Sequence, residues 1–432
     1  VIAPVIMNGV QGYLVDALHQ EDFRKLLFDN IVHSNSKLDA KLNFHCGTKL
    51  TQKTYQSSKF MGVEQSNTSI IYNDTLVLKI FRRIYINMNP DYEISRFLTE
   101  RMHFENSPAY KGSISVILTE GNITLGLMQE LVPNQGDAWK FMLEEVDRIF
   151  ENLSYRKIKI DKLPEVELFS RLRLNEIPHE IIDWAGLKIF LRIRTMATRT
   201  AEMHIALGSD IHETAFTPIT YNSDYSVWLK NRLTYQFQNR LNILENNLHK
   251  LDGLALELAN QFLDQKKNIR KIFLDFDWTK MKSERIRIHG DYHLGQVLVN
   301  GEDFFILDFE GEPESTISDR KVKQPPLKDV AGIFRSFHYA IYANIFNNKQ
   351  SELFMAGELL YKYFVGIFLQ TYTEVAQAGN LNIGYKNEID FLLKYCLLEK
   401  AVYELGYELN SRPRWSVIPL TGIASIMNFK TK

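Results

Sequence analysis

Strand-like and helix-like sequence patterns occupy different parts of this 432-residue chain. Most of the short runs rich in β-branched and aromatic residues lie in its first third, where they predict five strands: Gly62–Gln65, Ser69–Tyr72, Leu76–Phe81, Ser113–Thr119 and Thr124–Leu131. Asn73-Asp74 separates the second strand from the third and is typical of tight hairpin turns. The first third therefore predicts a small antiparallel sheet.

One helix interrupts this sheet, and helices dominate the rest of the chain. Asn89-Pro90 supplies an N-cap and a first-turn proline for a helix that ends near Arg101. The Pro- and Gly-containing stretch Val132–Gly136 is a candidate boundary. Helical periodicity follows at Asp137–Leu153, Asp183–Leu207, Asp224–Phe273, Asp329–Phe346, Leu353–Ala378 and Glu388–Leu409.

A single polar hairpin is predicted inside the helical part. Arg285–Asp308 has the pattern of a strand, a loop and a hairpin whose turn is Asn300-Gly301. This order of elements resembles protein-kinase-like folds. We therefore predict an α+β bilobal protein-kinase-like fold with an N-terminal cap (1–58), a small antiparallel-sheet N-lobe (59–132) and a mostly helical C-lobe (133–432).

Charge and cysteine content exclude several classes of partner. The 51 Lys and Arg residues balance the 52 Asp and Glu residues, so no long-range positive field would attract nucleic acid or an anionic membrane surface. Neither Cys46 nor Cys396 lies in a metal-binding or redox motif, which favours a reducing, cytoplasmic location. No apolar run is long enough to span a bilayer.

The hairpin region carries the strongest chemical signal. If its two strands pair, Gln296 and Asp308 lie together at one end, and the loop that carries Asp291 lies next to them. Phosphoryl transfer from ATP needs a carboxylate to take the proton of the attacking hydroxyl, together with oxygen ligands for Mg²⁺. Asp291 suits the first role, and Asp308 with the Gln296 amide oxygen suits the second. The alternative is that these aspartates only cap a turn and end a strand.

Lys79 is the candidate phosphate-binding residue. It lies in the middle of the apolar strand Leu76–Phe81, where an ammonium group is costly without anionic company. Nucleotide phosphates would provide that company, and Glu93 in the following helix would orient the amine, with Glu100 as the rival partner. The alternative is an edge-strand lysine that points into solvent.

Two further segments are candidates for nucleotide contacts. Ser66, Asn67 and Thr68 form a polar loop that could wrap phosphate, although no glycine-rich phosphate motif is present. Backbone groups at the lobe boundary are candidates for adenine, and they belong to Gln129, Glu130 and Val132. A plain hairpin loop and a plain connecting strand are the corresponding alternatives.

Six long motifs occur in the order found in one kinase family. They are GVEQSNTSIIYNDTLVLKIFRR, NPDYEISRFLTE, HGDYHLGQVLVN, FFILDFEGEP, KDVAGIFRSFHYA and YELGYELNSRPRW. From about Gly62 to Ile423 the chain resembles the maltokinases, a family of aminoglycoside-phosphotransferase-like kinases. The resemblance implies ATP- and Mg²⁺-dependent phosphorylation of the anomeric hydroxyl of maltose, which yields maltose 1-phosphate for α-glucan (glycogen) synthesis.

The resemblance also implies a role for each motif residue. Lys79 and Glu93 match the phosphate-binding lysine and its helix partner, Asp291 the catalytic base, and Gln296 and Asp308 the magnesium ligands. Gln296 departs from the asparagine that is usual in kinases at large. Maltokinases also occur fused behind a trehalose synthase domain, so a trehalose synthase partner or fusion is a further expectation.

The candidate sugar contacts lie on the last predicted helix and around it. Side chains at i, i+4, i+7 and i+8 share one helix face, and here they are Lys400, Glu404, Tyr407 and Glu408. The other candidates are His289, Asp329, Arg335, Arg412 and Trp415. The alternative for the helix is an exposed face with an ordinary Lys400–Glu404 ion pair, and the alternative for His289 is a brace of the catalytic loop.

Two other functions compete with maltose phosphorylation. The same chemistry could serve another sugar, a choline-like alcohol or an aminoglycoside, although a polycationic acceptor would need a more acidic pocket. A kinase-like scaffold that binds without catalysis would have lost Lys79, Asp291 or Asp308, and all three are present.

Overall fold

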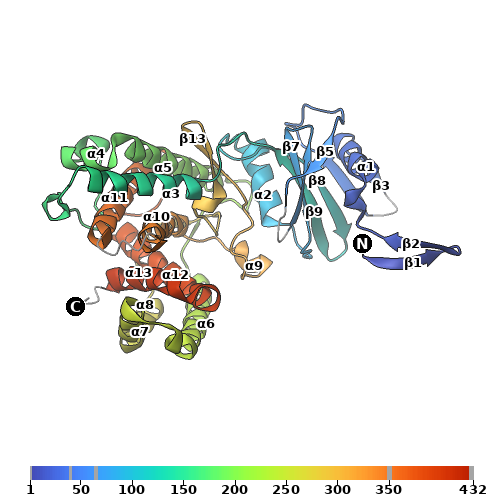
Figure 1. Cartoon of the computed structure of the whole chain (residues 1–432). Helices are drawn as coiled ribbons and strands as arrows, with labels where there is room; N and C mark the ends of the chain where they lie inside the picture. Colours follow the sequence, from blue (N-terminus) through green and yellow to red (C-terminus); the bar gives the residue numbers. More distant parts are fainter. Residues whose placement is uncertain (1, 38–40, 63–66, 348–352, 428–432) are drawn as a thin grey trace. The chain divides into compact units, whose positions relative to one another are not determined.

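The structure is a computed structural model that describes residues 2–37, 41–62, 67–347 and 353–427. It divides into two compact units. The first unit comprises Val1–Pro133 and Leu307–Arg320, and the second comprises Asn134–Ile306 and Lys321–Lys432. One unit is built on an antiparallel sheet and the other on helices (Figure 1), so the predicted α+β class is confirmed.

Seven strands form one antiparallel sheet in the described part of the first unit. Their order is β3-β4-β8-β9-β7-β6-β5. They are β3 Ser36–Lys37, β4 Leu42–Cys46, β5 Ser58–Phe60, β6 Asn67–Tyr72, β7 Leu76–Phe81, β8 Tyr110–Leu118 and β9 Gly121–Glu130. Helix α1 (Glu21–Val32) contributes Phe28 and Ile31 to a core that contains Ile70 and Leu78 of the sheet. This apolar core fixes the strands that carry the candidate nucleotide residues.

The predicted N-terminal cap is part of this sheet. Strand β4 pairs with β8 from Leu42↔Val116 to Cys46↔Gly112, so residues before 59 extend the sheet. Strand β5 (Ser58–Phe60), which pairs with β6, lies before the first predicted strand at Gly62–Gln65. Of the predicted range only Gly62 lies within the described residues.

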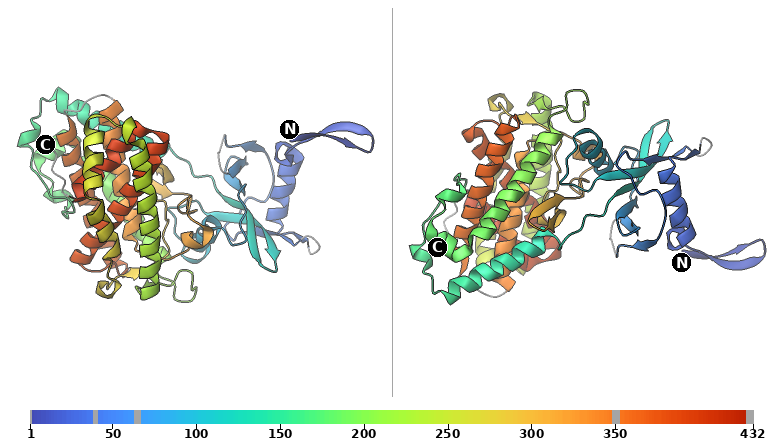
Figure 2. Two further views of the ribbon diagram at one scale, coloured as in Figure 1. Left: turned by 90° about the horizontal axis from the view of Figure 1, so that it is seen from below. Right: turned by 90° about the horizontal axis from the view of Figure 1, so that it is seen from above.

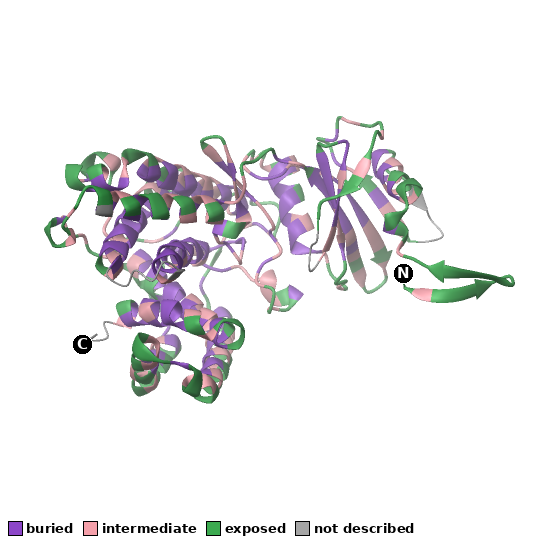
Figure 3. Cartoon of the chain, viewed as in Figure 1, coloured by how far each residue is buried: buried purple, intermediate pink, exposed green. Residues whose placement is uncertain are grey.

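The turn and helix signals of the first unit are confirmed. Asn73 and Asp74 have φ values of 52° and 53°, as a tight turn with two left-handed residues requires. Helix α2 (Pro90–Arg96) begins with the Asn89 side chain as its cap, and a π-helical turn continues it to Arg101. A separate hairpin of β1 (Ala3–Met7) and β2 (Val10–Leu14) is exposed along almost its whole length (Figure 3).

The second unit is mostly helical (Figure 2). Its helices are α3 Ala138–Tyr155, α4 His179–Ala185, α5 Leu187–Leu207, α6 Ser223–Asn247, α7 Gly253–Asp264, α8 Lys266–Leu274, α9 Ile317–Arg320 (which the division places in the first unit), α10 Leu327–Asn347, α11 Phe354–Ala378, α12 Lys386–Ser411 and α13 Val417–Met427. Two predicted helices are divided: Gly186, with φ of 86°, separates α4 from α5, and Asp224–Phe273 contains three helices. Helix α13 was not predicted.

Two short pairs of strands accompany these helices. Strands β10 (Ile219–Thr220) and β11 (Glu284–Arg285) form one pair. The predicted polar hairpin is formed by β12 (Val297–Asn300) and β13 (Asp303–Ile306), and Asn300 pairs with Asp303. The turn residues are therefore Gly301 and Glu302, one position later than predicted. Among the described helices, none combines the length and the apolar character needed to cross a membrane.

Candidate active site

Lys79 lies at the centre of a charged cluster in the first unit. Strand β7 lies between β6 and β9, so Lys79 is not on an edge strand. Its Nζ is 3.0 Å from Asp91 Oδ2 and 3.0 Å from Asp308 Oδ1. Burial works to lower the pKa of Lys79, but Asp308 and Asp91 outweigh it and raise the pKa. The lysine is therefore a fixed cation held between two carboxylates.

The partner of Lys79 on the helix is Asp91, in place of the predicted Glu93 or Glu100. Asn89 Oδ1 accepts a hydrogen bond from the Asp91 amide at 2.8 Å and starts the helix there. Each residue turns a helix by about 100°, so Glu93 points about 200° away from Asp91. Glu100 instead accepts hydrogen bonds from the Arg96 side chain and the Thr48 amide.

The Asp91 carboxylate is fully buried and held on several sides. Its Oδ1 accepts hydrogen bonds from the Phe309 amide at 3.0 Å and from the Ser95 hydroxyl at 3.4 Å. Ser95 in turn accepts one from Gln129 Nε2 at 3.0 Å. Gln129, predicted to face adenine, therefore supports the ion pair through its side chain.

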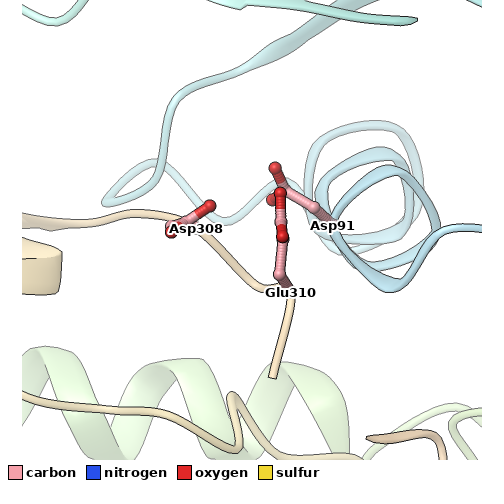
Figure 4. Close-up of side chains that lie close together, drawn as sticks. All are labelled: Asp91, Asp308 and Glu310. Atoms are coloured by element: carbon pink, nitrogen blue, oxygen red, sulfur yellow. The ribbon is translucent and has the colours of Figure 1, made fainter. Parts of the chain in front are cut away.

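Glu310 completes the cluster, and the sequence analysis did not single it out. Carboxylate oxygens of Asp91, Asp308 and Glu310 lie within 4.8 Å of one another (Figure 4). Burial, together with Asp308 and Asp91, raises the pKa of Glu310. Such a group of hard oxygen donors fits Mg²⁺. Because Asp91 is fully buried and also binds the Phe309 amide, the partly exposed Asp308 and Glu310 are the better candidates for metal ligands.

The predicted phosphate loop lies partly in strand β6. Asn67 Nδ2 donates a hydrogen bond to Glu310 Oε1 at 2.9 Å, and Thr68 Oγ1 accepts one from Arg82 Nε at 2.9 Å. Ser66 lies outside the described residues. Both described side chains therefore bind protein groups, and Asn67 connects the start of β6 to the acidic cluster.

The predicted adenine segment is tied into the first unit. The Glu130 amide donates to the Ala109 carbonyl at 2.9 Å, and the Leu131 amide donates to the Thr75 carbonyl at 2.8 Å. The Glu130 side chain pairs with Lys111 at 3.4 Å, and Val132 is buried. The Glu130 amide thus already has a protein partner, and adenine contacts by the other backbone groups of this segment stay a prediction.

Asp329 in α10 supports the loop that carries Asp291 in the second unit. Its Oδ2 accepts a hydrogen bond from the His289 amide at 2.8 Å, and its Oδ1 accepts one from the Gly290 amide at 3.0 Å. The His289 side chain is only 1% exposed, and its ring lies 5.3 Å from that of Tyr292. The direct sugar contacts predicted for Asp329 and His289 are corrected: both are buried and fix the loop.

His204 in α5 belongs to the same buried network. Its Nε2 is 3.0 Å from Asp329 Oδ2, and its Nδ1 is 2.9 Å from the Tyr372 hydroxyl. Burial works to raise the pKa of Asp329, but the hydrogen bond and charge of His204 and the loop contacts outweigh it and lower the pKa. An ionised Asp329 can only accept, so Nε2 donates. No local motif indicates this role for His204, because its partner Asp329 lies 125 positions away.

Helix α10 also approaches the loop that carries Asp291 without an intervening side chain. A Cβ added to Gly332 would lie 2.3 Å from the Tyr292 carbonyl oxygen, so only glycine fits there. The Ser336 hydroxyl accepts a hydrogen bond from the Leu294 amide at 3.0 Å. The loop is therefore fixed on α10 by backbone contacts as well as by Asp329.

Gln296 ends a single 3₁₀ turn, Leu294–Gln296, immediately before β12. Its amide donates to the His293 carbonyl at 2.9 Å. Gln296 and Asp291 belong to the second unit, whereas Asp308 belongs to the first. The predicted convergence of Asp308 with Asp291 and Gln296 stays a prediction.

The polar stripe of α12 faces other charged groups. Lys400 Nζ is 3.2 Å from Asp291 Oδ1, and Glu404 Oε2 is 2.8 Å from Arg335 Nε. Glu408 accepts two hydrogen bonds from Arg412, at 3.0 and 2.7 Å. The alternative of an exposed helix face is therefore wrong for Lys400, Glu404 and Glu408, whose side chains are largely buried.

The remaining sugar candidates differ in exposure. Arg335 is 2% exposed and Glu408 is 2% exposed, so both act as supports and not as surface contacts. The Arg412 guanidinium lies over the Trp415 ring at 4.4 Å, and Tyr407 is 53% exposed. Of the predicted sugar candidates, Tyr407 and Arg412 are exposed and Trp415 is partly exposed.

Sequence comparison finds sugar kinases among known proteins. No family model matches the chain. A glucosamine kinase of Mycolicibacterium smegmatis is 30% identical over 147 residues, which are 32% of this chain and 34% of that protein. A glucosamine kinase of Streptacidiphilus jiangxiensis is 21% identical over 281 residues, 64% of this chain and 53% of that protein. The chain thus spans about a third and about half of the length of these curated relatives.

Structural comparison gives the fold. A glucosamine kinase structure (crystal form B) matches with a TM-score of 0.70 and 16% identity, covering 97% of this chain and 88% of that one. A glucosamine kinase in complex with glucosamine, ADP and inorganic phosphate matches with a TM-score of 0.65 and 17% identity, covering 98% and 86%. The chain has the fold of these kinases. The predicted protein-kinase-like fold is confirmed at this level.

Proposed function

We propose that the chain is an ATP- and Mg²⁺-dependent kinase that phosphorylates a hydroxyl group of a sugar. The observation that carries the proposal is the partly buried Asp91–Lys79–Asp308 ion-pair network in the first unit. A lysine fixed between carboxylates is the arrangement that phosphate binding and metal binding require. The similarity to glucosamine kinases supports a sugar as the acceptor.

Each unit contributes one part of the proposed chemistry. Lys79, oriented by Asp91, would bind the nucleotide phosphates, and Asp308 and Glu310 would hold Mg²⁺, with Gln296 as the further ligand that the motif resemblance implies. When bound, the metal ion would supply positive charge that stabilises the phosphates. Asp291 accepts the proton of the sugar hydroxyl while the hydroxyl oxygen attacks the γ-phosphorus of ATP. The bond between the γ-phosphorus and the β,γ-bridging oxygen breaks, and ADP is released.

We infer maltose as the acceptor from the motif resemblance, with maltose 1-phosphate as the product. Glucosamine is the second candidate, because both curated relatives are glucosamine kinases. The two sugars can be separated chemically. Phosphorylation at the anomeric hydroxyl removes the reducing end, whereas phosphorylation elsewhere preserves it. A cytoplasmic location and a trehalose synthase partner or fusion belong to the same proposal.

An ADP-release assay tests the function. Maltose, glucose, trehalose, glucosamine and an aminoglycoside are offered with ATP, with and without Mg²⁺, and product reducing ends are counted. We expect Mg²⁺-dependent turnover of a sugar that falls about 10²-fold or more in Asp291→Ala, since a positioned base is lost.

The matched control is Asp224→Asn, an exposed aspartate at the start of α6 in the same unit. It should keep the wild-type rate. Full activity in Asp291→Ala would show that Asp291 is not the base, and the absence of turnover with every sugar would refute the proposed function.

A further inference from the structure

The catalytic loop has a cationic neighbour whose role the proposed chemistry does not explain. Lys400 Nζ lies 3.2 Å from Asp291 Oδ1, and the two side chains are 22% and 20% exposed. Both groups therefore remain reachable from solvent. The Tyr403 ring, 5.2 Å from Nζ, supports the ammonium from a second side.

Each acidic group along this face is matched by an internal cation. Asp291 pairs with Lys400, Glu404 with Arg335, and Glu408 with Arg412. These three carboxylates and three cations sum to zero charge. An acceptor that carries an ammonium group would have to compete with a protein cation at every one of these carboxylates.

The three groups nearest the loop are electrostatically coupled. Burial raises the pKa of Glu404. The positive charges of Arg335 and Lys400 oppose this rise, and the negative charge of Asp291 adds to it. Lys400 therefore acts on Glu404 as well as on Asp291, with no direct Lys400–Glu404 ion pair needed. A hydroxyl that approaches the Asp291 carboxylate necessarily approaches the Lys400 ammonium.

We propose that Lys400 is a specificity-determining residue that makes the site accept neutral sugars and disfavour cationic amino sugars. The inference rests on the proposed function and refines its acceptor class. The physical basis is repulsion between two ammonium groups a few ångströms apart in a partly desolvated site, which is much stronger than in bulk water. The Lys400–Asp291 contact also holds the carboxylate in place before the acceptor arrives.

The test compares glucose with glucosamine, which differ only in the group next to the anomeric carbon, and adds N-acetylglucosamine and maltose. N-Acetylglucosamine has the nitrogen without the charge, so it separates charge from size. The measured quantity is the ratio of kcat/KM for the neutral sugar to that for the amino sugar, at a pH where the amine is protonated. Calorimetric binding of the same sugars provides a second measurement.

We expect the wild-type protein to favour the neutral sugar. Lys400→Gln should shift the ratio toward glucosamine by about 10-fold or more, as expected when a nearby like charge is removed. Lys400→Arg keeps the charge and should keep the ratio. Lys394→Gln, an exposed lysine on the same helix, should change nothing.

Several outcomes would overturn the inference while leaving the proposed function intact. One is a wild-type protein that prefers glucosamine to glucose and to maltose. Another is a Lys400→Gln protein that loses activity equally with all sugars, because a residue that only braces the loop would not change the ratio. Failure of the function itself has a different signature: no sugar is phosphorylated by the wild-type protein, and none is bound.

Discussion

Two carboxylates separated by one residue have different environments at the start of helix α2. Asp91 is fully buried against Lys79, whereas Glu93 is partly exposed on another face. We predict that Asp91→Asn lowers kcat/KM for the nucleotide about 10-fold or more, because it leaves the buried Lys79 with one carboxylate partner fewer. Steady-state kinetics at varied ATP concentration measures the effect.

Glu93→Gln is the matched control for Asp91→Asn. It removes the same charge from the same turn of the helix and should leave the nucleotide kinetics within about 2-fold of wild type. A larger loss of kcat/KM in Glu93→Gln than in Asp91→Asn would show that Glu93 is the functional partner of Lys79, as the sequence predicts.

His338 in α10 is a buried histidine beside a cation. Its Nδ1 is 3.3 Å from Arg335 Nη1, and its Nε2 is 3.7 Å from Glu358. Burial and the Arg335 charge lower the pKa of His338 from 6.5 to about 4. The unfolded chain therefore binds a proton that the folded protein rejects between these two pH values. Stability is fully present above the unfolded pKa and is lost as the pH falls toward the folded pKa.

We predict that lowering the pH from about 7.5 to about 5.5 removes roughly 1 kcal/mol of unfolding free energy through His338. His338→Gln should remove this part of the pH dependence, since glutamine does not titrate and its amide oxygen can accept from Arg335. Denaturant unfolding of both proteins at the two pH values measures the difference. If the unfolding free energy of the variant changes with pH as much as that of the wild type, the pH dependence comes from other groups.

At the scale of elements, helix α10 and the catalytic loop touch through Gly332. A methyl group there would meet the Tyr292 carbonyl oxygen at 2.3 Å, and this oxygen belongs to the backbone and cannot rotate away. Alanine normally stabilises a helix relative to glycine by up to about 1 kcal/mol. We predict the opposite sign for Gly332→Ala: a loss of about 1–3 kcal/mol and a lower kcat, measured by denaturant unfolding and turnover.

Gly357→Ala in the neighbouring helix α11 is the control for Gly332→Ala. An added Cβ there would meet Ile341 Cγ2 and Ile345 Cδ1 at 2.9 Å, and these atoms belong to side chains, which can shift more easily than backbone. Its effect should be smaller. Equal losses in the two variants would mean that the loop contact has no special role.

Local signals in the sequence predicted the helices and strands well, but they could not predict contacts between residues that are far apart in the sequence. Asn73-Asp74 and Asn89-Pro90 identified a turn and a helix start because those residues act on their own backbone. Gly186 divided a predicted helix because its left-handed conformation interrupts the periodicity without changing the apolar pattern around it. Asp91 was missed in favour of Glu93, since which of the two faces Lys79 depends on how α2 packs against β7.

At the scale of the molecule, the segment Leu307–Arg320 groups with the first unit although its neighbours in sequence belong to the second. Asp308 thereby reaches Lys79 across 229 positions of sequence. The motif resemblance predicted both residues, but Glu310 emerged only from the fold. Motif spacing can identify residues that act together, whereas the number of carboxylates around them depends on packing.

The grouping of Asp308 with Lys79 predicts where nucleotide binding stabilises the protein. ATP with Mg²⁺ at about 100 times its Kd should add roughly 2.7 kcal/mol to the unfolding free energy and raise Tm. Asp308 has φ of 64°, a conformation that asparagine tolerates well, so Asp308→Asn should fold while losing a metal ligand. We expect this variant to lose most of the Mg²⁺-dependent rise in Tm. Glu302→Gln in the exposed β12–β13 turn should retain the rise, and a full Mg²⁺-dependent rise in Asp308→Asn would remove Asp308 from the metal site.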